Sequence, residues 1–235
     1  MTYFTSRLND ILCRIDDACE KSGRDPGQIR LIAVSKRHDI GRVREAIDAG
    51  QIDFGENLIQ EAIPKIAATR KNNVIWHFIG HLQSNKTRAA ATHFDWVHTV
   101  DSPKIARRLS DQRPATKGPL MVCIQVRIGD ENSKSGVAPD DVPELANLIL
   151  GLPNLELRGL MTIPPPADDL ETQRGYFEAL REIKNSARLA EYNLDTLSMG
   201  MSGDLEAAIF EGATMLRIGT ALFGPRPGST ETRTG

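Results

Sequence analysis

The 235-residue sequence has few cysteines, few aromatic residues and no large excess of charge of one sign. Its cysteines, Cys13, Cys19 and Cys123, are odd in number and form no CxxC pair, which argues against a disulfide framework and a zinc site. We expect all three to be small buried hydrophobic residues. The formal net charge is −2 and the basic residues are scattered, so the charge pattern does not favour nucleic acid or a membrane surface as a partner.

Long apolar runs are also missing. No segment approaches the roughly 20 apolar residues that a membrane-spanning helix needs. The first ten residues, MTYFTSRLND, lack the apolar core of a secretory signal. These absences predict a cytoplasmic protein in a reducing compartment.

What the sequence does contain is a regular alternation of short apolar runs and helical patterns. The first run, residues 29–36 (IRLIAVSK), is short, β-branched and almost uniformly apolar. This pattern predicts a strand that is buried on both faces of a parallel sheet. The expected strands are 29–36, 52–54, 74–79, 96–100, 120–126, 155–161, 197–199 and 215–218. The expected helices are 6–21, 40–49, 58–68, 86–92, 103–113, 142–150, 170–191 and 203–211.

Eight strands separated by helices predict an α/β fold, a single (β/α)₈ TIM barrel with an extra N-terminal helix. An open doubly wound sheet is the alternative, which periodicity alone does not exclude. We assign residues 1–224 to one barrel domain. Residues 225–235 are rich in Pro, Gly, Ser and Thr, a composition that predicts a disordered C-terminal tail.

Lys36 lies directly after the run Leu31–Ser35, at the C-terminal end of the first expected strand, where barrels place their functional residues. We expect its amine at the barrel mouth, where partial desolvation lowers the pKa of a lysine and favours the neutral form. A neutral amine attacks aldehydes and forms a Schiff base. On this feature alone, a solvated lysine at a strand end is the simpler interpretation.

Two glycine- and hydroxyl-bearing loops, 198–203 (SMGMSG) and 217–220 (RIGT), follow the seventh and eighth expected strands. Barrels often bind phosphate after these strands, at the N-terminus of a short helix. The alternative is that the glycines serve ordinary turns and that Ser202 caps a helix over 203–211. Asp204 would repel an anion unless it points away.

Strand eight neighbours strand one in a closed barrel, so both loops would lie beside Lys36. An aldehyde that also carries a phosphate fits such a site. The common cofactor with both groups is pyridoxal 5′-phosphate.

Eight short motifs occur in order along nearly the whole chain. They are AVSK (33–36), FGEN (54–57), WHFIG (76–80), LQSNK (82–86), SKSG (133–136), RGLM (158–161), LSMGMS (197–202) and RIGT (217–220). In this order they resemble the motifs of the pyridoxal phosphate homeostasis proteins, whose barrel is similar to the N-terminal domain of alanine racemase.

The resemblance implies that pyridoxal 5′-phosphate is held as an internal aldimine on Lys36. It implies that Arg217 faces the pyridine nitrogen, where a permanently protonated guanidinium leaves the ring a weak electron sink. The other cofactor-binding residues that it implies are Asn57 beside the ring and Met201, Ser202, Gly219 and Thr220 at the phosphate. The family often has a proline three residues after the lysine, where this chain has Asp39.

Other polar residues have mainly structural interpretations. We expect His77 and His81, which flank a strand end, to be structural rather than to line the site. Glu56 is interpreted as a capping or ion-pair residue rather than a base. Lys86 and Lys134 are interpreted first as solvated lysines, with the hypothesis that one of them receives or hands over the cofactor.

Two functional classes fit these features. One is a non-catalytic carrier that acts in intracellular homeostasis of the cofactor and delivers it to the apo forms of pyridoxal phosphate enzymes. The other is a pyridoxal phosphate-dependent amino-acid racemase, which needs acid–base groups on both faces of its substrate. The tyrosines, Tyr3, Tyr176 and Tyr192, fall in helical or terminal segments, and we expect no second domain of the kind that alanine racemases add. We therefore expect a carrier and a monomer.

Overall fold

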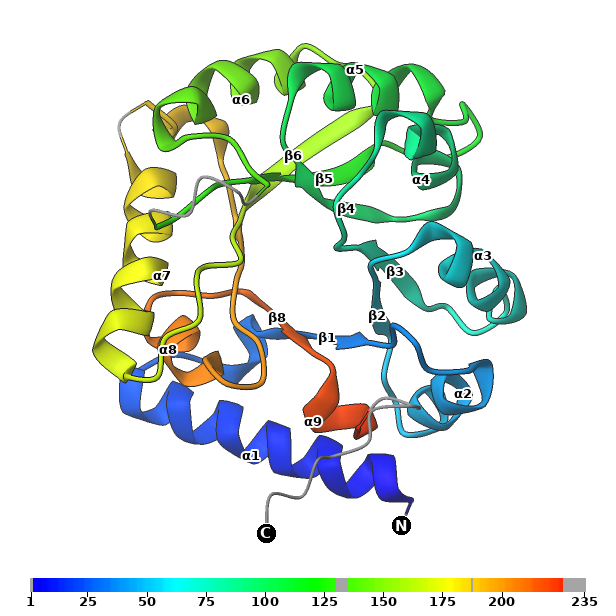
Figure 1. Ribbon diagram of the computed structural model, residues 1–235, viewed down its shortest axis with the longest axis vertical. Helices are drawn as coiled ribbons and strands as arrows, with labels where there is room; N and C mark the ends of the chain where they lie inside the picture. The colour runs from blue at the N-terminus through cyan, green and yellow to red at the C-terminus, as the bar shows by residue number, and fades with distance from the viewer. Residues whose placement is uncertain (1, 130–134, 187, 226–235) are drawn as a thin grey trace, which may run out of the picture.

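Eight parallel strands close into a barrel in the computed structural model, which describes residues 2–129, 135–186 and 188–225. The strands are β1 (Arg30–Val34), β2 (Asp53–Glu56), β3 (Ile75–Phe78), β4 (Trp96–Val100), β5 (Leu120–Gln125), β6 (Leu155–Met161), β7 (Thr196–Ser198) and β8 (Met215–Ile218). They pair in chain order and β8 pairs with β1 (Figure 1). The predicted (β/α)₈ barrel is confirmed and the open sheet is excluded.

Helices surround the barrel, and one precedes the first strand (Figure 1). They are α1 (Tyr3–Ser22), α2 (Ile40–Asp48), α3 (Ile59–Ala68), α4 (Thr87–His93), α5 (Pro103–Gln112), α6 (Val142–Leu150), α7 (Leu170–Asn185), α8 (Leu205–Phe210) and α9 (Thr220–Phe223). Four short 3₁₀ turns join them, η1 (Pro26–Gln28), η2 (Ser84–Lys86), η3 (Pro139–Asp141) and η4 (Ala190–Tyr192). All of these helices in the described residues are too short or too polar to cross a lipid bilayer.

The extra N-terminal helix α1 packs against α8 and α9, across the outside of the barrel where β8 meets β1 (Figure 1). Its start is capped by Thr2, whose hydroxyl accepts a hydrogen bond from the Thr5 N–H at 3.2 Å. Its apolar residues recur at helical spacing and are buried on one face. Cys19 lies on this face, whereas Cys13 lies on the solvent face and is exposed, so the prediction that all three cysteines are buried is wrong for Cys13.

Closure of the barrel sets the position of the first and last strands. Ile32 pairs with Arg217 and Ala33 with Ile218. Lys36 follows β1 within two residues, and loop 217–220 is the end of β8. The C-terminal ends of both strands are therefore neighbours at the same mouth.

Two predictions about helix ends are wrong. The helix expected over 170–191 ends at Asn185, because Ser186 has an extended backbone (φ −62°, ψ 149°), and Asn and Ser are residues that compete for backbone hydrogen bonds. The second, at α8, belongs to the site described below. The predicted tail, 225–235, lies outside the described residues except for Pro225.

Candidate functional site

A cavity of about 480 Å³ opens at the C-terminal ends of the strands. This volume is in the range of roughly 300–1,000 Å³ that is usual for small-molecule sites. The cavity brings together all seven predicted cofactor-binding residues, which are Lys36, Asn57, Met201, Ser202, Arg217, Gly219 and Thr220. Its other lining residues are Val34, His38, Ile79, Gly80, His81, Ile163 and Gly203.

Lys36 stands in a tight turn between β1 and α2. The turn closes through a hydrogen bond of 3.1 Å from the His38 N–H to the Ser35 carbonyl. Asp39 then begins α2, because its carboxylate accepts a hydrogen bond from the Arg42 N–H at 3.1 Å. The aspartate that replaces the family's proline therefore supplies a helix cap, and the turn forms without the proline.

A buried ion pair lies next to this turn. The Lys65 ammonium donates to Glu56 Oε1 at 2.7 Å and to the Ser35 carbonyl at 2.8 Å, and the Ser35 hydroxyl donates to the same carboxylate oxygen at 2.6 Å. Glu56 is fully buried, and burial raises the pKa of its carboxyl group. The interpretation of Glu56 as an ion-pair residue is confirmed.

The loop after β7 depends on a glycine with a left-handed backbone. Gly200 has φ +94°, and a Cβ atom there would lie 2.5 Å from the Ala208 Cβ, so a larger residue does not fit. The Asp204 carboxylate accepts a hydrogen bond of 2.5 Å from the Met201 N–H, which holds it within the loop and away from the cavity lining. Asp204, rather than Ser202, occupies the position before α8, so the prediction of a helix starting at 203 with Ser202 as its cap is wrong.

Helix α1 holds the loops 198–203 and 217–220 from the outside of the barrel. Arg14 Nη2 donates to the Ser202 carbonyl at 3.1 Å, and Arg14 Nε donates to the Glu206 carboxylate at 2.8 Å. About two helical turns earlier, Arg7 Nη1 donates to the Thr220 carbonyl at 3.0 Å. Sequence reasoning missed this role of the helix, since the two arginines look like ordinary residues of a solvent face.

Arg217 is a buried cation in the wall of the cavity, with 4% of its surface exposed. Its Nη1 donates to the Ser198 hydroxyl and its Nη2 to the Thr162 carbonyl, both at 2.8 Å. Burial lowers the pKa of Arg217 to about 10, so it stays protonated near neutral pH. Among the described residues no carboxylate forms an ion pair with it, and its orientation is set by two neutral acceptors.

Asn57 provides a buried acceptor that lacks a partner. Its Oδ1 is inaccessible to solvent and receives no hydrogen bond. The main chain of Asn57 is packed closely against Gly80, where a Cβ atom would lie 2.2 Å from the main-chain carbonyl oxygen of Asn57. Because an unsatisfied buried acceptor is costly, this atom is a place for a ligand that donates a hydrogen bond.

Several lining residues were not foreseen. His38 is stacked on Phe223 with ring centroids 5.0 Å apart, and its only sequence signal was its place two residues after Lys36. Ile163 had no signal, and His81 lines the cavity although a structural role was preferred for it. His77, by contrast, is fully buried and does not line the cavity.

Of the two loop lysines, the structure describes one. Lys86 ends the turn η2 and does not line the cavity. Lys134 lies outside the described residues.

Comparison with known proteins identifies the family. The family model described as the N-terminal domain of alanine racemase matches residues 15–227. A pyridoxal phosphate homeostasis protein from Pseudomonas aeruginosa is 54% identical over 226 residues, which cover 96% of this chain and 97% of that relative. A protein with the same name from Escherichia coli K12 is 48% identical over 232 residues, covering 96% and 98%.

Among solved structures, PipY of Synechococcus elongatus with PLP bound is 36% identical and superposes with a TM-score of 0.79. The match covers 94% of this chain and all of that one (100%). Identity at this level over nearly the full length of each protein extends the likeness beyond the fold. The chain therefore belongs to the pyridoxal phosphate homeostasis protein family, which shares the barrel of the alanine racemase N-terminal domain.

Proposed function

We propose that this protein binds pyridoxal 5′-phosphate through Lys36 and acts in its intracellular homeostasis as a non-catalytic carrier. One observation carries the proposal. A lysine, a buried arginine and two loops with hydroxyl and backbone donors line the same cavity. The names of the curated relatives and the PipY structure with PLP bound support it.

The residues present fit this cofactor group by group. The Lys36 amine matches the aldehyde, which reacts reversibly with a neutral amine and is thereby stored. The hydroxyls of Ser202 and Thr220 and the nearby backbone N–H groups supply donors for a phosphate. The unpartnered Oδ1 of Asn57 is an acceptor, and the ring hydroxyl of the cofactor is a donor that matches it.

Arg217 explains why holding rather than turnover is the expected outcome. We propose that its guanidinium donates to the pyridine nitrogen. A donor that keeps its own proton leaves this nitrogen unprotonated, so the ring withdraws electrons weakly. Storage of the aldehyde does not require the ring to withdraw electrons, whereas most reactions of amino acids on this cofactor do require it.

The racemase alternative has less support. Within the described part of the chain none of the three tyrosines lines the cavity, and the curated relatives are named as homeostasis proteins. Tyr3 contacts Arg7 and Tyr192 donates to Asn147 at 2.6 Å, on the outer helices. Assays with a panel of amino acids should show no racemase or transaminase turnover, and robust turnover would contradict the carrier proposal.

The direct test is the intact mass of the protein before and after borohydride reduction. The reduced protein should gain one pyridoxyl phosphate group, located on Lys36 by peptide mapping. Lys36→Ala should abolish the fixed adduct, while Lys86→Ala, a lysine outside the cavity, should keep it. An adduct on another lysine, or no adduct in the wild type, would overturn the proposal.

We also propose that the protein is a cytoplasmic monomer that delivers the cofactor to the apo forms of pyridoxal phosphate enzymes. Its three cysteines are unpaired, as is usual in a reducing compartment. Light scattering in solution should give the mass of one chain. Mixing the loaded protein with an apo enzyme should restore that enzyme's activity, and slower transfer from a Lys86→Ala or Lys134→Ala variant would identify the lysine that hands over the cofactor.

A further inference from the structure

The interior of the barrel contains a row of polar side chains that the proposed function does not use. His77 on β3, His98 on β4 and Ser198 on β7 are fully buried, and Asp53 at the start of β2 is 5% exposed. Burial of polar groups is costly unless each is hydrogen-bonded, so their arrangement needs an explanation.

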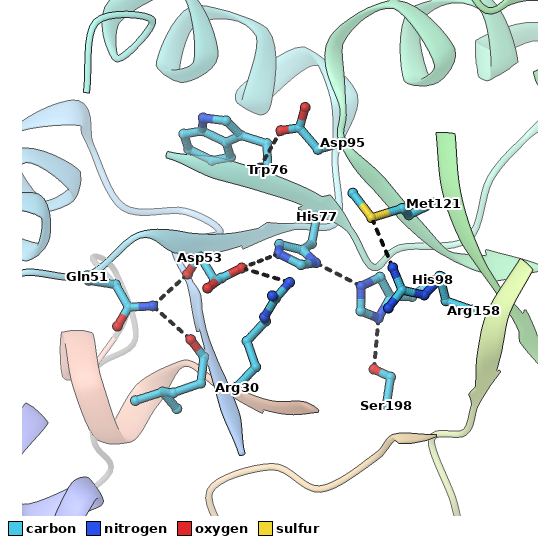
Figure 2. A network of polar contacts seen from close by, with 11 residues as sticks. Arg30, Gln51, Asp53, Trp76, His77, Asp95, His98, Met121, Arg158 and Ser198 are labelled. Carbon is cyan, nitrogen blue, oxygen red and sulfur yellow. Dashed lines mark hydrogen bonds and ion pairs between the residues drawn. The ribbon is translucent and has the colours of Figure 1, made fainter. Parts of the chain in front are cut away.

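These side chains form a continuous chain of hydrogen bonds (Figure 2). Asp53 Oδ1 lies 2.8 Å from His77 Nε2, and His77 Nδ1 lies 2.9 Å from His98 Nε2. His98 Nδ1 lies 2.8 Å from the Ser198 hydroxyl. The same hydroxyl accepts the hydrogen bond of 2.8 Å from Arg217 Nη1, so the chain ends on the cation in the cofactor cavity.

The direction of every bond follows from the two ends. The Asp53 carboxylate forms an ion pair with Arg30 Nη1 at 3.7 Å and only accepts hydrogen bonds, so His77 Nε2 carries a proton. Burial lowers the pKa of both histidines, so both are neutral and each has one donor and one acceptor nitrogen.

The remaining bonds follow in turn. His77 Nδ1 must accept, so the proton of His98 is on Nε2. His98 Nδ1 then accepts from the Ser198 hydroxyl. This leaves the oxygen of Ser198 free to accept from Arg217.

We propose that Asp53, His77 and His98 are positioning residues for Arg217, which orient its guanidinium in the cofactor cavity through a hydrogen-bond chain of fixed direction. The inference rests on the proposed function, since it assigns these residues a part in holding the cofactor. Ser198 offers its oxygen to Arg217 because its own proton is already given to His98. The acceptor that fixes all the tautomers is Asp53, at the opposite mouth of the barrel.

A carboxylate at that mouth supplies a matched control. Asp53 and Asp195 both line a second cavity of about 730 Å³ at the N-terminal ends of the strands. Asp195 pairs with Arg158 and takes no part in the chain. Replacing either residue removes a charge from the same end of the molecule, but only replacement of Asp53 breaks the chain.

The first test needs no cofactor. Nitrogen-15 NMR of the histidine rings in the full-length apo protein should show His77 and His98 as neutral Nε2–H tautomers at about pH 7. In Asp53→Ala the second tautomer should appear for both rings, while Asp53→Asn, which keeps an acceptor oxygen, and Asp195→Ala should resemble the wild type. A wild-type protein with either ring charged or protonated on Nδ1 would overturn the proposal, whether or not the variants fold.

The second test measures the cofactor. Ser198→Ala should raise the Kd for pyridoxal phosphate about tenfold and change the absorption spectrum of the bound form, because Arg217 loses one of its two acceptors. Asp53→Ala should act in the same direction with a smaller factor, about threefold, and Asp53→Asn should restore binding. Asp195→Ala and Ser110→Ala, a buried serine outside the chain, should leave both readouts unchanged.

The two proposals fail in different ways. Equal Kd values and spectra for Asp53→Ala and the wild type would overturn the positioning role. A wild-type protein that binds no pyridoxal phosphate would overturn the proposed function instead, and the NMR measurement would still decide whether the chain exists.

Discussion

Two fully buried histidines make the stability of this barrel depend on pH. Burial lowers the pKa of His77 and His98 below the value of about 6.5 that they regain on unfolding. Below about pH 6.5 the unfolded chain therefore binds more protons than the folded one, and the free energy of unfolding decreases as the pH falls. Their contribution is complete above that pH. Two such sites give a slope of at most about 2.7 kcal/mol per pH unit.

Denaturant unfolding between about pH 5 and pH 8 measures this slope. A free energy of unfolding that stays constant from about pH 6.5 down to pH 5.5 would contradict the assignment of both rings as neutral.

The ion pair beside Lys36 leads to a second prediction at this scale. Lys65→Met leaves the Glu56 carboxylate buried without its cation and should lower the free energy of unfolding by about 3–5 kcal/mol. Adding Glu56→Gln to this variant should recover much of the loss, because the uncompensated charge is gone. Urea unfolding of the single and double variants tests it, and a loss below about 1 kcal/mol in the single variant would show that the pair matters little.

At the scale of elements, β6 and β7 meet through a glycine. A Cβ atom at Gly159 would lie 1.8 Å from the Thr196 carbonyl oxygen, so Gly159→Ala must push the two strands apart. We expect a loss of about 3 kcal/mol in the free energy of unfolding. Gly175→Ala is the control, since nothing lies within 4 Å of its Cβ position in α7, and alanine there should add up to about 1 kcal/mol. Equal effects of the two changes would show that the strands accommodate the methyl group.

Helix α1 should influence the cofactor although it does not line the cavity. Arg14→Gln and Arg7→Gln remove the hydrogen bonds to the Ser202 and Thr220 carbonyls, so the two loops lose their outer support. We expect the Kd for pyridoxal phosphate to rise about three- to tenfold for each variant. Arg88→Gln, on the exposed face of α4, should leave it unchanged, and fluorescence titration compares the three. A Kd equal to that of the wild type would limit α1 to a role in packing.

How well each element could be predicted depends on what defines its ends. The strands expected over 96–100, 155–161 and 215–218 have the observed bounds, because each is a short, mainly apolar run between residues that favour turns. The end of α7 and the start of α8 were misplaced. Those bounds depend on hydrogen bonds between particular side chains and backbone groups, such as the bond from the Met201 N–H to the Asp204 carboxylate. The spacing of apolar residues does not reveal such bonds.

At the scale of the whole molecule, the cofactor cavity joins the first strand to the last. A ligand that binds only the folded state should therefore stabilise the entire barrel. At a concentration of 100 times Kd the expected gain is about 2.7 kcal/mol, seen as a higher melting temperature. Lys36→Ala should show a smaller gain at the same concentration, and an identical gain would mean that binding does not use Lys36.

The part of the site that lies at strand ends could be predicted from the sequence, whereas the part that depends on contacts across the barrel could not. The rule that functional residues gather at the C-terminal ends of barrel strands, together with the ordered motifs, was sufficient to name the seven lining residues that meet in one cavity. The interior chain was missed because it joins residues as far apart as His98 and Ser198, 100 positions along the sequence. Such a contact becomes visible only when the register of the strands is known.

Closure of β1 on β8 has a consequence for biosynthesis. A chain emerging from the ribosome exposes Lys36 early, but β8, which pairs with β1, and the loop 217–220 are translated only after the other seven strands. With the phosphate on loop 217–220, as proposed, a nascent chain that lacks β8 has no place for that group. Capture of the cofactor is then deferred until β8 has been translated, and a product that terminates before β8 takes no part in holding vitamin B6 in the cell.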